Sequence, residues 1–386
     1  TLRVVTWPLA ACRIAPSNRA CYKPRIPRHP GCRTVSEDQA LNNRVGGRTM
    51  PLVDVHNHIL SKMYTELLAE HGRPRYHLQQ DAEGRTVVMR QGARFMTFTE
   101  PMFDPEIRLR AMDEVGVGMQ LLSYTCPNCY WAEGSMAETV ARVMNDHLAE
   151  VCGRWPDRFR GLASVPLQNV NLALKELDRA VDQLGMVGLI LLANVNETPL
   201  DDPRFEHFWA ALNDRQLPVL LHPTVPPGIE SMGMDQYGLV PSVGFMIDTT
   251  LAVARMLYAG VFERYPDWPL IISHAGATLP FISGRLDQCY RLIPDARARI
   301  SRPPSEYLKR LYYDTVCYDE QALLLTYKLA GPRQMLYGSD YPHNIGDVRG
   351  CAARIEALPI SEGEKVMIRS GNAQRIFKLS RSSGFE

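Results

Sequence analysis

The sequence predicts an α/β fold, a (β/α)8 TIM barrel with a small hairpin or sheet inserted after the first strand. From residue 52 to residue 340, a short apolar run, a polar or glycine-bearing turn and a helical pattern follow one another, and eight such runs occur. Most runs are apolar throughout, as parallel strands are when helices cover both faces of their sheet. A doubly wound open sheet is the alternative. It would place a glycine-rich loop after the first strand, and HNHILSK contains no glycine.

Each repeat is expected to supply one strand and one helix. The predicted strands are 52–58, 117–124, 160–167, 187–193, 218–223, 269–275, 311–316 and 334–340. Between the third and fourth strands, the segment 171–185 carries its leucines and a valine near a single stripe of a helix, and Gly185 is expected to end it.

The segment from about 61 to 102 is too long for a simple loop between a strand and a helix. Within it, RPRYHLQQDAEGRTVVMRQGARFMTF predicts a hairpin or small sheet that turns at Asp81–Gly84. We expect this insertion to lie over the C-terminal mouth of the barrel, where it would form one wall of a pocket.

The two ends of the chain differ from the predicted barrel domain, which spans 50–380. Residues 1–49 hold nine Lys or Arg residues against Glu37 and Asp38, several prolines and no periodic pattern, which predicts an irregular basic N-terminal extension. A transit peptide, translation upstream of a start at Met50, and a basic arm for nucleic acid are the alternatives, and the last lacks interleaved aromatic residues. Residues 381–386 are expected to form a C-terminal tail.

Composition excludes several classes of protein. The net charge of +1 gives no reason to expect nucleic acid as a partner, and no uninterrupted apolar run approaches the ~18 residues of a membrane span. Nine cysteines, an odd number spread over the chain, favour a reduced cytoplasmic protein over a disulfide scaffold. The CPNC sequence at 126–129 has no second CxxC at zinc-ribbon distance, so loop cysteines are favoured over a redox or zinc-ribbon motif.

Metal-binding residue types stand at the ends of four predicted strands, where a barrel collects its chemistry. They are His56, His58, His222, His274 and Asp340. Residues two apart on a strand point to the same face, so His56 and His58 would share one space. Three imidazoles and one carboxylate suit zinc, with manganese, iron or cobalt as alternatives. Because a catalytic metal needs an open position, one of the five residues is better placed as an acid/base.

The motifs DVHNH, LLHP, ISHAGATLPFISGR and YGSDYPH resemble the decarboxylase branch of the amidohydrolase superfamily, in particular the α-amino-β-carboxymuconate-ε-semialdehyde decarboxylases, over about 51–378. The resemblance implies one divalent ion per chain, held by His56, His58, His222 and Asp340, with His274 as the acid/base. Binuclear members of the superfamily carry a lysine at the end of the fourth strand. Here that strand reads LILLANVNE, which predicts a mononuclear site.

The same resemblance implies that Arg285 reaches the neighbouring subunit's active site to hold a substrate carboxylate, so a homodimer is expected. A helix-surface arginine is the alternative. Where the family has a second arginine this chain has Met96, with Arg94 two residues away, and Thr198 replaces a pocket tryptophan. Phe95 and other aromatic residues either stack on a flat substrate or pack under a loop. The others are Phe98, Phe103, Tyr124, Tyr130 and Trp131.

The predicted function is therefore metal-dependent, non-oxidative decarboxylation of an unsaturated or aromatic carboxylic acid. The proton would be handled by His274, as in semialdehyde decarboxylases, or delivered by Asp340, as in resorcylate decarboxylases; HxH rather than ExH on the first strand favours the former. A mononuclear hydrolase or hydratase of a lactone or oxo-dicarboxylate is the alternative enzyme. A catalytically silent metal-binding scaffold is the non-enzymatic alternative, and it would leave His274 without a role.

Overall fold

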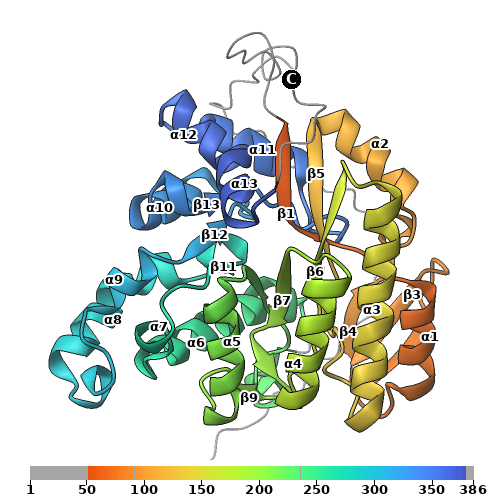
Figure 1. The fold of residues 1–386 in the computed structure, drawn as a ribbon, viewed down its shortest axis with the longest axis horizontal. Coiled ribbons are helices and arrows are strands. Elements are labelled where there is room, and N and C mark those ends of the chain that lie inside the picture. Colours follow the sequence, from red (N-terminus) through yellow and green to blue (C-terminus); the bar gives the residue numbers. More distant parts are fainter. Residues whose placement is uncertain (1–50, 91–92, 235, 380–386) are drawn as a thin grey trace, which may run out of the picture. The chain divides into compact units, whose positions relative to one another are not determined.

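Eight parallel strands form a barrel in the computed structural model, which describes residues 51–90, 93–234 and 236–379 (Figure 1). The strands neighbour one another in chain order: β1 (Leu52–His58), β5 (Val117–Ser123), β6 (Phe159–Ala163), β7 (Gly188–Leu192), β10 (Val219–His222), β11 (Leu270–Ile272), β12 (Tyr312–Asp314) and β13 (Met335–Leu336). Between the first and last strands, Val55 N donates to Tyr337 O at 3.0 Å, and Asn57 bridges in parallel with Tyr341. The predicted (β/α)8 fold is confirmed. The predicted segments 1–49 and 381–386 lie outside the described residues.

The interior of the barrel is filled by one or two apolar side chains from most strands. The cluster comprises Val53, Val55, Met119, Leu121, Leu162, Ile190, Leu220, Ile271 and Leu336, and α13 (Asn372–Ile376) packs against it through Ala373 and Ile376. A larger cluster lies between the strands and the surrounding helices. Because apolar residues fill the lower part of the barrel, polar groups are left for its C-terminal mouth.

The helices around the barrel alternate with its strands. Their bounds are α2 (Pro105–Val115), α3 (Gly134–Arg154), α4 (Val170–Asp178), α5 (Glu206–Arg215), α6 (Phe245–Tyr258), α7 (Val261–Arg264), α8 (Leu279–Leu292), α9 (Pro304–Leu308), α10 (Glu320–Ala330), α11 (Val348–Ala357) and α12 (Glu362–Val366). The helix predicted at 171–185 corresponds to α4 and a following π-helical turn, and Gly185 ends it with φ +69°.

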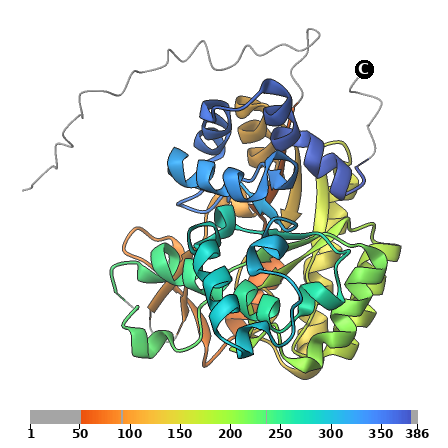
Figure 2. The same cartoon turned by 90° about the vertical axis from the view of Figure 1, so that its left-hand side faces the viewer.

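The insertion after β1 contains the predicted small sheet, which is antiparallel and three-stranded: β2 (Tyr76–Gln80), β3 (Thr86–Arg90) and β4 (Ala93–Thr97). It turns at Asp81–Gly84, where Asp81 Oδ1 accepts from the amide of Arg85 at 2.9 Å and Gly84 adopts φ +75°. A helix that the sequence analysis did not predict, α1 (Lys62–His71), precedes the sheet. Figure 2 shows the sheet beside the segment that follows β10, and Phe95 packs there against Val225, Ile229 and Met234.

One helical stretch, Val240–Tyr258, is long and apolar enough to cross a membrane, with a mean hydropathy of 1.3 over its most apolar window. The expectation that no segment reaches that length holds only for uninterrupted apolar runs. One such helix is weak evidence for a membrane span, because a core helix of a globular protein meets the same criterion. Here one face of α6 is buried in the barrel wall through Ala252, Val253, Met256 and Leu257.

Candidate metal centre

A register shift in β1 between Asp54 and Asn57 orients the two histidines of the HxH motif. Simple alternation from Val53 and Val55, which belong to the barrel interior, would place His56 on the outside. Beyond the shift, Asn57 Oδ1 instead accepts from Arg108 of the outer helix α2. Such irregularities re-aim side chains near active sites, and this one turns His56 and His58 into the barrel.

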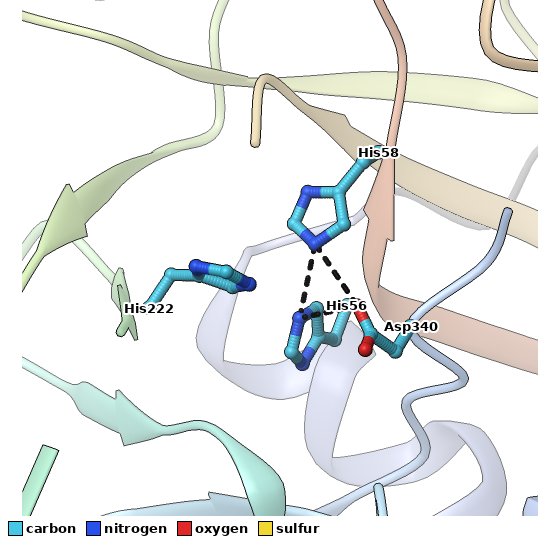
Figure 3. Close-up of side chains that lie close together, drawn as sticks. All are labelled: His56, His58, His222 and Asp340. Atoms are coloured by element: carbon cyan, nitrogen blue, oxygen red, sulfur yellow. Dashed lines mark hydrogen bonds and ion pairs between the residues drawn. The ribbon is translucent and has the colours of Figure 1, made fainter. Parts of the chain in front are cut away.

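The predicted ligands come together at the C-terminal mouth of the barrel. His56, His58, His222 and Asp340 are all buried, and their ligand atoms lie within 4.8 Å of one another. Figure 3 shows the four side chains converging, with His56 Nε2 3.1 Å from His58 Nε2 and Asp340 Oδ1 3.2 Å from His58 Nε2. His222 ends β10. Asp340 lies four residues beyond β13 in an irregular segment and has φ +59°.

Each of the three imidazoles uses Nδ1 for a contact away from the centre. His56 Nδ1 lies 2.5 Å from Asp314 Oδ2, His222 Nδ1 lies 2.7 Å from the carbonyl oxygen of Pro223, and His58 Nδ1 lies 3.2 Å from Ser123 Oγ. Metal-binding histidines typically hold the second ring nitrogen in this way. The three Nε2 atoms are therefore left for the centre.

A bound cation would neutralise the fourth ligand, the carboxylate of Asp340. Asp340 Oδ1 is buried without a hydrogen-bond donor, although it lies 3.4 Å from His56 Nε2. A buried carboxylate oxygen without a donor is costly unless a cation or a proton neutralises it. Three imidazole nitrogens and one carboxylate oxygen form a donor set suited to zinc or another divalent transition metal. The residues present thus fit one divalent ion.

Burial keeps two of the imidazoles neutral. It lowers the pKa of His58 to about 3 and the pKa of His222 well below its usual value. For His56, burial acts in the same direction, but the hydrogen bond to Asp314 and the charge of that carboxylate outweigh it and raise the pKa. For Asp340, burial acts to raise the pKa, but the neighbouring imidazoles, His274 and His58 foremost, favour the charged carboxylate and hold the pKa well below its usual range. The carboxylate is therefore ionised, as a metal ligand must be.

His274 begins a 3-10 turn directly after β11, with φ +55°, and its ring lies beside the metal group. Ring centroids are 5.2 Å apart for His274 and His56 and 5.8 Å for His274 and His222. Its Nε2 lies 3.7 Å from Asp340 Oδ2, and its Nδ1 is buried without a hydrogen-bond partner. His274 does not belong to the four-residue group but contacts it, as the resemblance implied.

A cavity of about 340 Å³ opens above the metal group and is lined by His222, His274 and Asp340. Its walls come from β4 of the inserted sheet, the loop after β5, Met234 with the segment 238–245, and the loop after β13. Apolar side chains dominate two of these walls, among them Phe95, Met96, Met234 and Phe245.

The predicted substrate-binding residues are not all in this cavity. Arg94 and Phe95 line it, but Arg94 Nη2 already lies 3.0 Å from Asp81 Oδ2. Thr198 lies outside the lining, paired with Val195 in a short hairpin of β8 (Asn194–Val195) and β9 (Thr198–Pro199). Replacing a large tryptophan by threonine at that position therefore does not bring its hydroxyl to the site.

Arg285 is exposed on α8, outside the cavity of its own chain, and forms no hydrogen bond or ion pair with the described residues. Most of the aromatic residues proposed to stack on a substrate pack elsewhere. Phe98 contacts Phe103 edge to face at 5.4 Å, Tyr124 hydrogen-bonds His147, and Tyr130 and Trp131 line a separate small cavity.

Several residues that sequence reasoning missed support or surround the centre. Asp314 ends a strand that was predicted, so its position was a usable signal, yet it was given no role. Arg108 was given no role either. Its buried guanidinium donates to Asn57 Oδ1 at 3.2 Å, to Gln120 Oε1 at 3.0 Å and to the carbonyl oxygen of His58. Burial lowers the pKa of Arg108 to about 10, which still leaves it charged at neutral pH. No pattern in the sequence predicts that the guanidinium of Arg108 is buried.

The CPNC cysteines are buried and free. Burial raises the pKa of Cys126 to about 12 and also raises that of Cys129, so neither thiol resembles a reactive thiolate. Within the described residues, neither belongs to a group that could hold a metal ion. Cys126 lines the cavity, and Cys129 Sγ contacts the carbonyl oxygen of Val165 at 3.3 Å.

Comparisons with known proteins agree with this geometry. The chain is 31% identical over 331 residues to a 2-amino-3-carboxymuconate-6-semialdehyde decarboxylase from Dictyostelium discoideum, covering 85% of this chain and 91% of that protein. It is similar to the solved structure of a 5-carboxyvanillate decarboxylase from Sphingomonas paucimobilis, with a TM-score of 0.74, 25% identity, and coverage of 86% of this chain and 100% of the other.

A third relative was solved with a metal. It is a dihydroxybenzoic acid decarboxylase from Polaromonas sp. JS666 with bound manganese and the inhibitor 2-nitroresorcinol, with a TM-score of 0.71, 26% identity, and coverage of 87% of this chain and 99% of the other. The model of the family described as amidohydrolase matches residues 53–379, from β1 to the end of the described barrel. The chain therefore belongs to the amidohydrolase family, alongside its decarboxylases.

Proposed function

We propose that this protein is a metal-dependent, non-oxidative decarboxylase, a carboxy-lyase that acts on a small unsaturated or aromatic carboxylic acid. The observation that carries the proposal is a four-residue metal group at the base of a cavity of about 340 Å³, with the imidazole of His274 beside it. A cavity of this size accommodates a small organic molecule. The three relatives compared above are decarboxylases of carboxylic acids by name.

Zinc is the ion we propose, one per chain, with manganese, iron or cobalt as alternatives. Imidazole-rich sites with one carboxylate suit zinc, whereas the Polaromonas relative holds manganese. When bound, the ion would polarise an oxygen of the substrate or of a water molecule. The four ligands would be His56, His58, His222 and Asp340.

The reaction replaces a bond from carbon to carboxylate by a bond from carbon to hydrogen. Carbon dioxide leaves, one proton is added to the carbon, and no oxidant is needed. We propose that His274 handles this proton, because its ring contacts the metal group and its Nδ1 has no partner. The pKa of Asp340 lies well below its usual range, so that carboxylate is ionised at neutral pH, which suits its proposed role as a ligand.

A homodimer completed by Arg285 is a further part of the proposal. The exposed Arg285 lies near an apolar surface on two neighbouring helices, which Tyr258 Oη joins by donating to the Leu286 carbonyl oxygen at 3.0 Å. Phe281 on α8 is 82% exposed and Leu251 on α6 is 46% exposed. Exposed apolar side chains of this kind, with an unpaired arginine among them, are typical of protein interfaces.

Mixing two inactive variants tests this arrangement. If Arg285 acts in the neighbouring site, a heterodimer of Arg285→Ala and His274→Ala chains contains one site with both groups intact. A mixture that has exchanged subunits should then recover roughly a quarter of wild-type turnover, as random pairing predicts. No recovery, or a monomer in light scattering, would contradict the dimeric site.

We also propose a cytoplasmic location, which is supported by the free state of the described cysteines.

The central experiment measures carbon dioxide release. Metal-loaded protein would be screened against carboxylated phenols and muconate-type acids, with lactones and oxo-dicarboxylates assayed for water addition in parallel. Release of carbon dioxide by the wild type but not by His274→Asn would support the proposal. Water addition without carbon dioxide would instead identify a hydrolase or hydratase.

A further inference from the structure

One histidine in the cavity wall, His343, has no place in the proposed reaction. It follows Asp340 by three residues and donates its backbone N–H to the Asp340 carbonyl oxygen at 3.1 Å. Its ring centroid lies 5.0 Å from that of His58, and it lines the cavity without belonging to the metal group. The ring of His274 instead contacts His56 and His222. The two imidazoles outside the metal group therefore flank it from different sides.

Thr125 holds the ring of His343 in one orientation. Thr125 is fully buried in the loop after β5, and its Oγ1 lies 2.9 Å from His343 Nε2. The other possible acceptor for the threonine hydroxyl is Cys126 Sγ at 3.8 Å. The hydroxyl can donate to Nε2, since an imidazole nitrogen accepts a hydrogen bond more strongly than a thiol. In a neutral ring, Nδ1 then carries the hydrogen, and it forms no hydrogen bond with the described residues.

The remaining lining offers little else for a substrate carboxylate. Among the described residues that line the cavity, Arg94 is the one Lys or Arg, and it is paired with Asp81 at the rim. Apart from the ligands, His274 and Arg94, the polar side chains of the lining are Thr97, Thr125, Cys126, His343 and Asn344. Of these, His343 brings a hydrogen-bond donor next to a metal ligand. Phe95 and Phe245 supply flat apolar surface for a ring.

We propose that His343 is a substrate-binding residue, whose Nδ1–H donates to an oxygen of the bound acid, and that Thr125 is the positioning residue that holds the required tautomer. The proposal rests on the proposed decarboxylase function. A bound acid that places one oxygen at the metal group can present a second to His343, either the other carboxylate oxygen or the oxygen of a neighbouring substituent.

The test uses 2-nitroresorcinol, which presents nitro oxygens beside hydroxyl groups, titrated into metal-loaded full-length protein by calorimetry. His343→Phe keeps the ring but removes the donor, and we expect binding to weaken by roughly 10- to 100-fold with bound metal unchanged. His343→Asn places an amide near the position of Nδ1 and should keep most of the affinity. His343→Gln places the amide near the position of Nε2 and should lose affinity as His343→Phe does. Thr125→Val should weaken binding, whereas Thr125→Ser should restore it.

Binding and turnover of the His343 variants separate a role in holding the substrate from the decarboxylase function itself. For any acid that releases carbon dioxide, His343→Phe should raise KM by a similar factor with a smaller change in kcat. Wild-type affinity in His343→Phe, equal losses in the Asn and Gln variants, or loss of metal from His343→Phe would overturn the assignment. Failure of the wild type to bind 2-nitroresorcinol would also contradict the assignment, because this ligand offers oxygens to both positions. If no acid is decarboxylated but the variants rank as expected in binding, the proposed function fails and the binding site stands.

Discussion

The Nδ1 atom of His56 lies 2.5 Å from Oδ2 of Asp314, and both side chains are fully buried. The other oxygen of the same carboxylate accepts from the amides of Ala275 at 2.9 Å and Val316 at 3.0 Å. Ala275 follows His274 in the chain. One carboxylate at the end of β12 therefore orients a metal ligand and also fixes the turn that carries the proposed acid/base.

This relationship predicts that Asp314→Asn weakens metal binding. The amide is a poorer acceptor and no longer carries the charge that makes His56 a better ligand. Affinity should fall by roughly 10- to 100-fold, the usual cost of losing such a partner. Competition with a chelator measures it. Asp319→Asn serves as a control, because Asp319 caps α10 through the amide of Ala322, away from the ligands. Equal affinities in wild type and Asp314→Asn would contradict the assigned role.

Metal binding should also depend on pH through His56. Burial acts to lower its pKa, but the bond to Asp314 prevails and raises it, so the metal-free site holds a proton on this ring at lower pH. A ligand must be deprotonated, so affinity should rise as pH rises through the pKa of His56 and then level off. His58, with a pKa of about 3, should contribute nothing above pH ~5.

The raised pKa of His56 should also make the stability of the metal-free protein depend on pH. In the metal-free protein, a histidine with a raised pKa stabilises the fold at pH values below its unfolded pKa of about 6.5, and this contribution is lost as pH rises through the folded value. In Asp314→Asn, the rise in metal affinity should move to lower pH. Calorimetry of metal binding between pH 5.5 and 8 measures the rise in affinity in the wild type and its shift to lower pH in the variant. A wild-type affinity that stays flat across that range would rule out a protonated His56.

Substitutions should separate the proton-handling residue from the ligands. His274→Asn should keep its metal while turnover falls by roughly 10²-fold or more, the scale of lost acid/base catalysis. His222→Ala and Asp340→Ala should lose metal, because each removes one of the four donors. Elemental analysis and single-turnover rates provide the two readouts. An empty site in His274→Asn with a full site in Asp340→Ala would reverse the roles.

We expect about one divalent ion per chain. The strand that carries a bridging lysine in binuclear relatives reads GLILL in β7, with no lysine. The described residues offer one group of suitable donors. Elemental analysis of protein purified with excess metal and then dialysed checks the number. Two ions retained per chain would show that a second site exists.

Gly338 should tolerate no side chain. A Cβ atom there would lie 2.9 Å from His56 Cβ and 3.2 Å from Asp314 Cβ, so Gly338→Ala should displace both of these side chains. Overpacking of this kind costs about 1–3 kcal/mol, and metal affinity should fall with it. Gly284→Ala in α8 is the matched control, since no atom lies within 4 Å of its added Cβ. Thermal melts with and without metal should separate the two variants.

The fold could be predicted from the sequence because its cause is local. Eight apolar runs alternating with amphipathic segments require buried parallel strands and covering helices, and a barrel satisfies both. The inserted sheet followed from the turn at Asp81–Gly84 and the alternation around it. The helix α1 was missed because its apolar face is short: only Tyr64 and Leu68 are buried.

The sequence by itself determined the barrel and five candidate metal-binding residues, because strand ends that meet at one mouth of a barrel bring their side chains together whatever the loop lengths between them. The family resemblance then separated four ligands from His274. Tertiary structure alone decided which residues support and line the site. Asp314 and Thr125 contact His56 and His343 through hydrogen bonds between residues that are 258 and 218 positions apart in the chain. Such contacts depend on how loops pack in three dimensions, which no local periodicity encodes. For the same reason Thr198, aligned with a pocket residue of the family, lies in a hairpin beside the cavity and not in it.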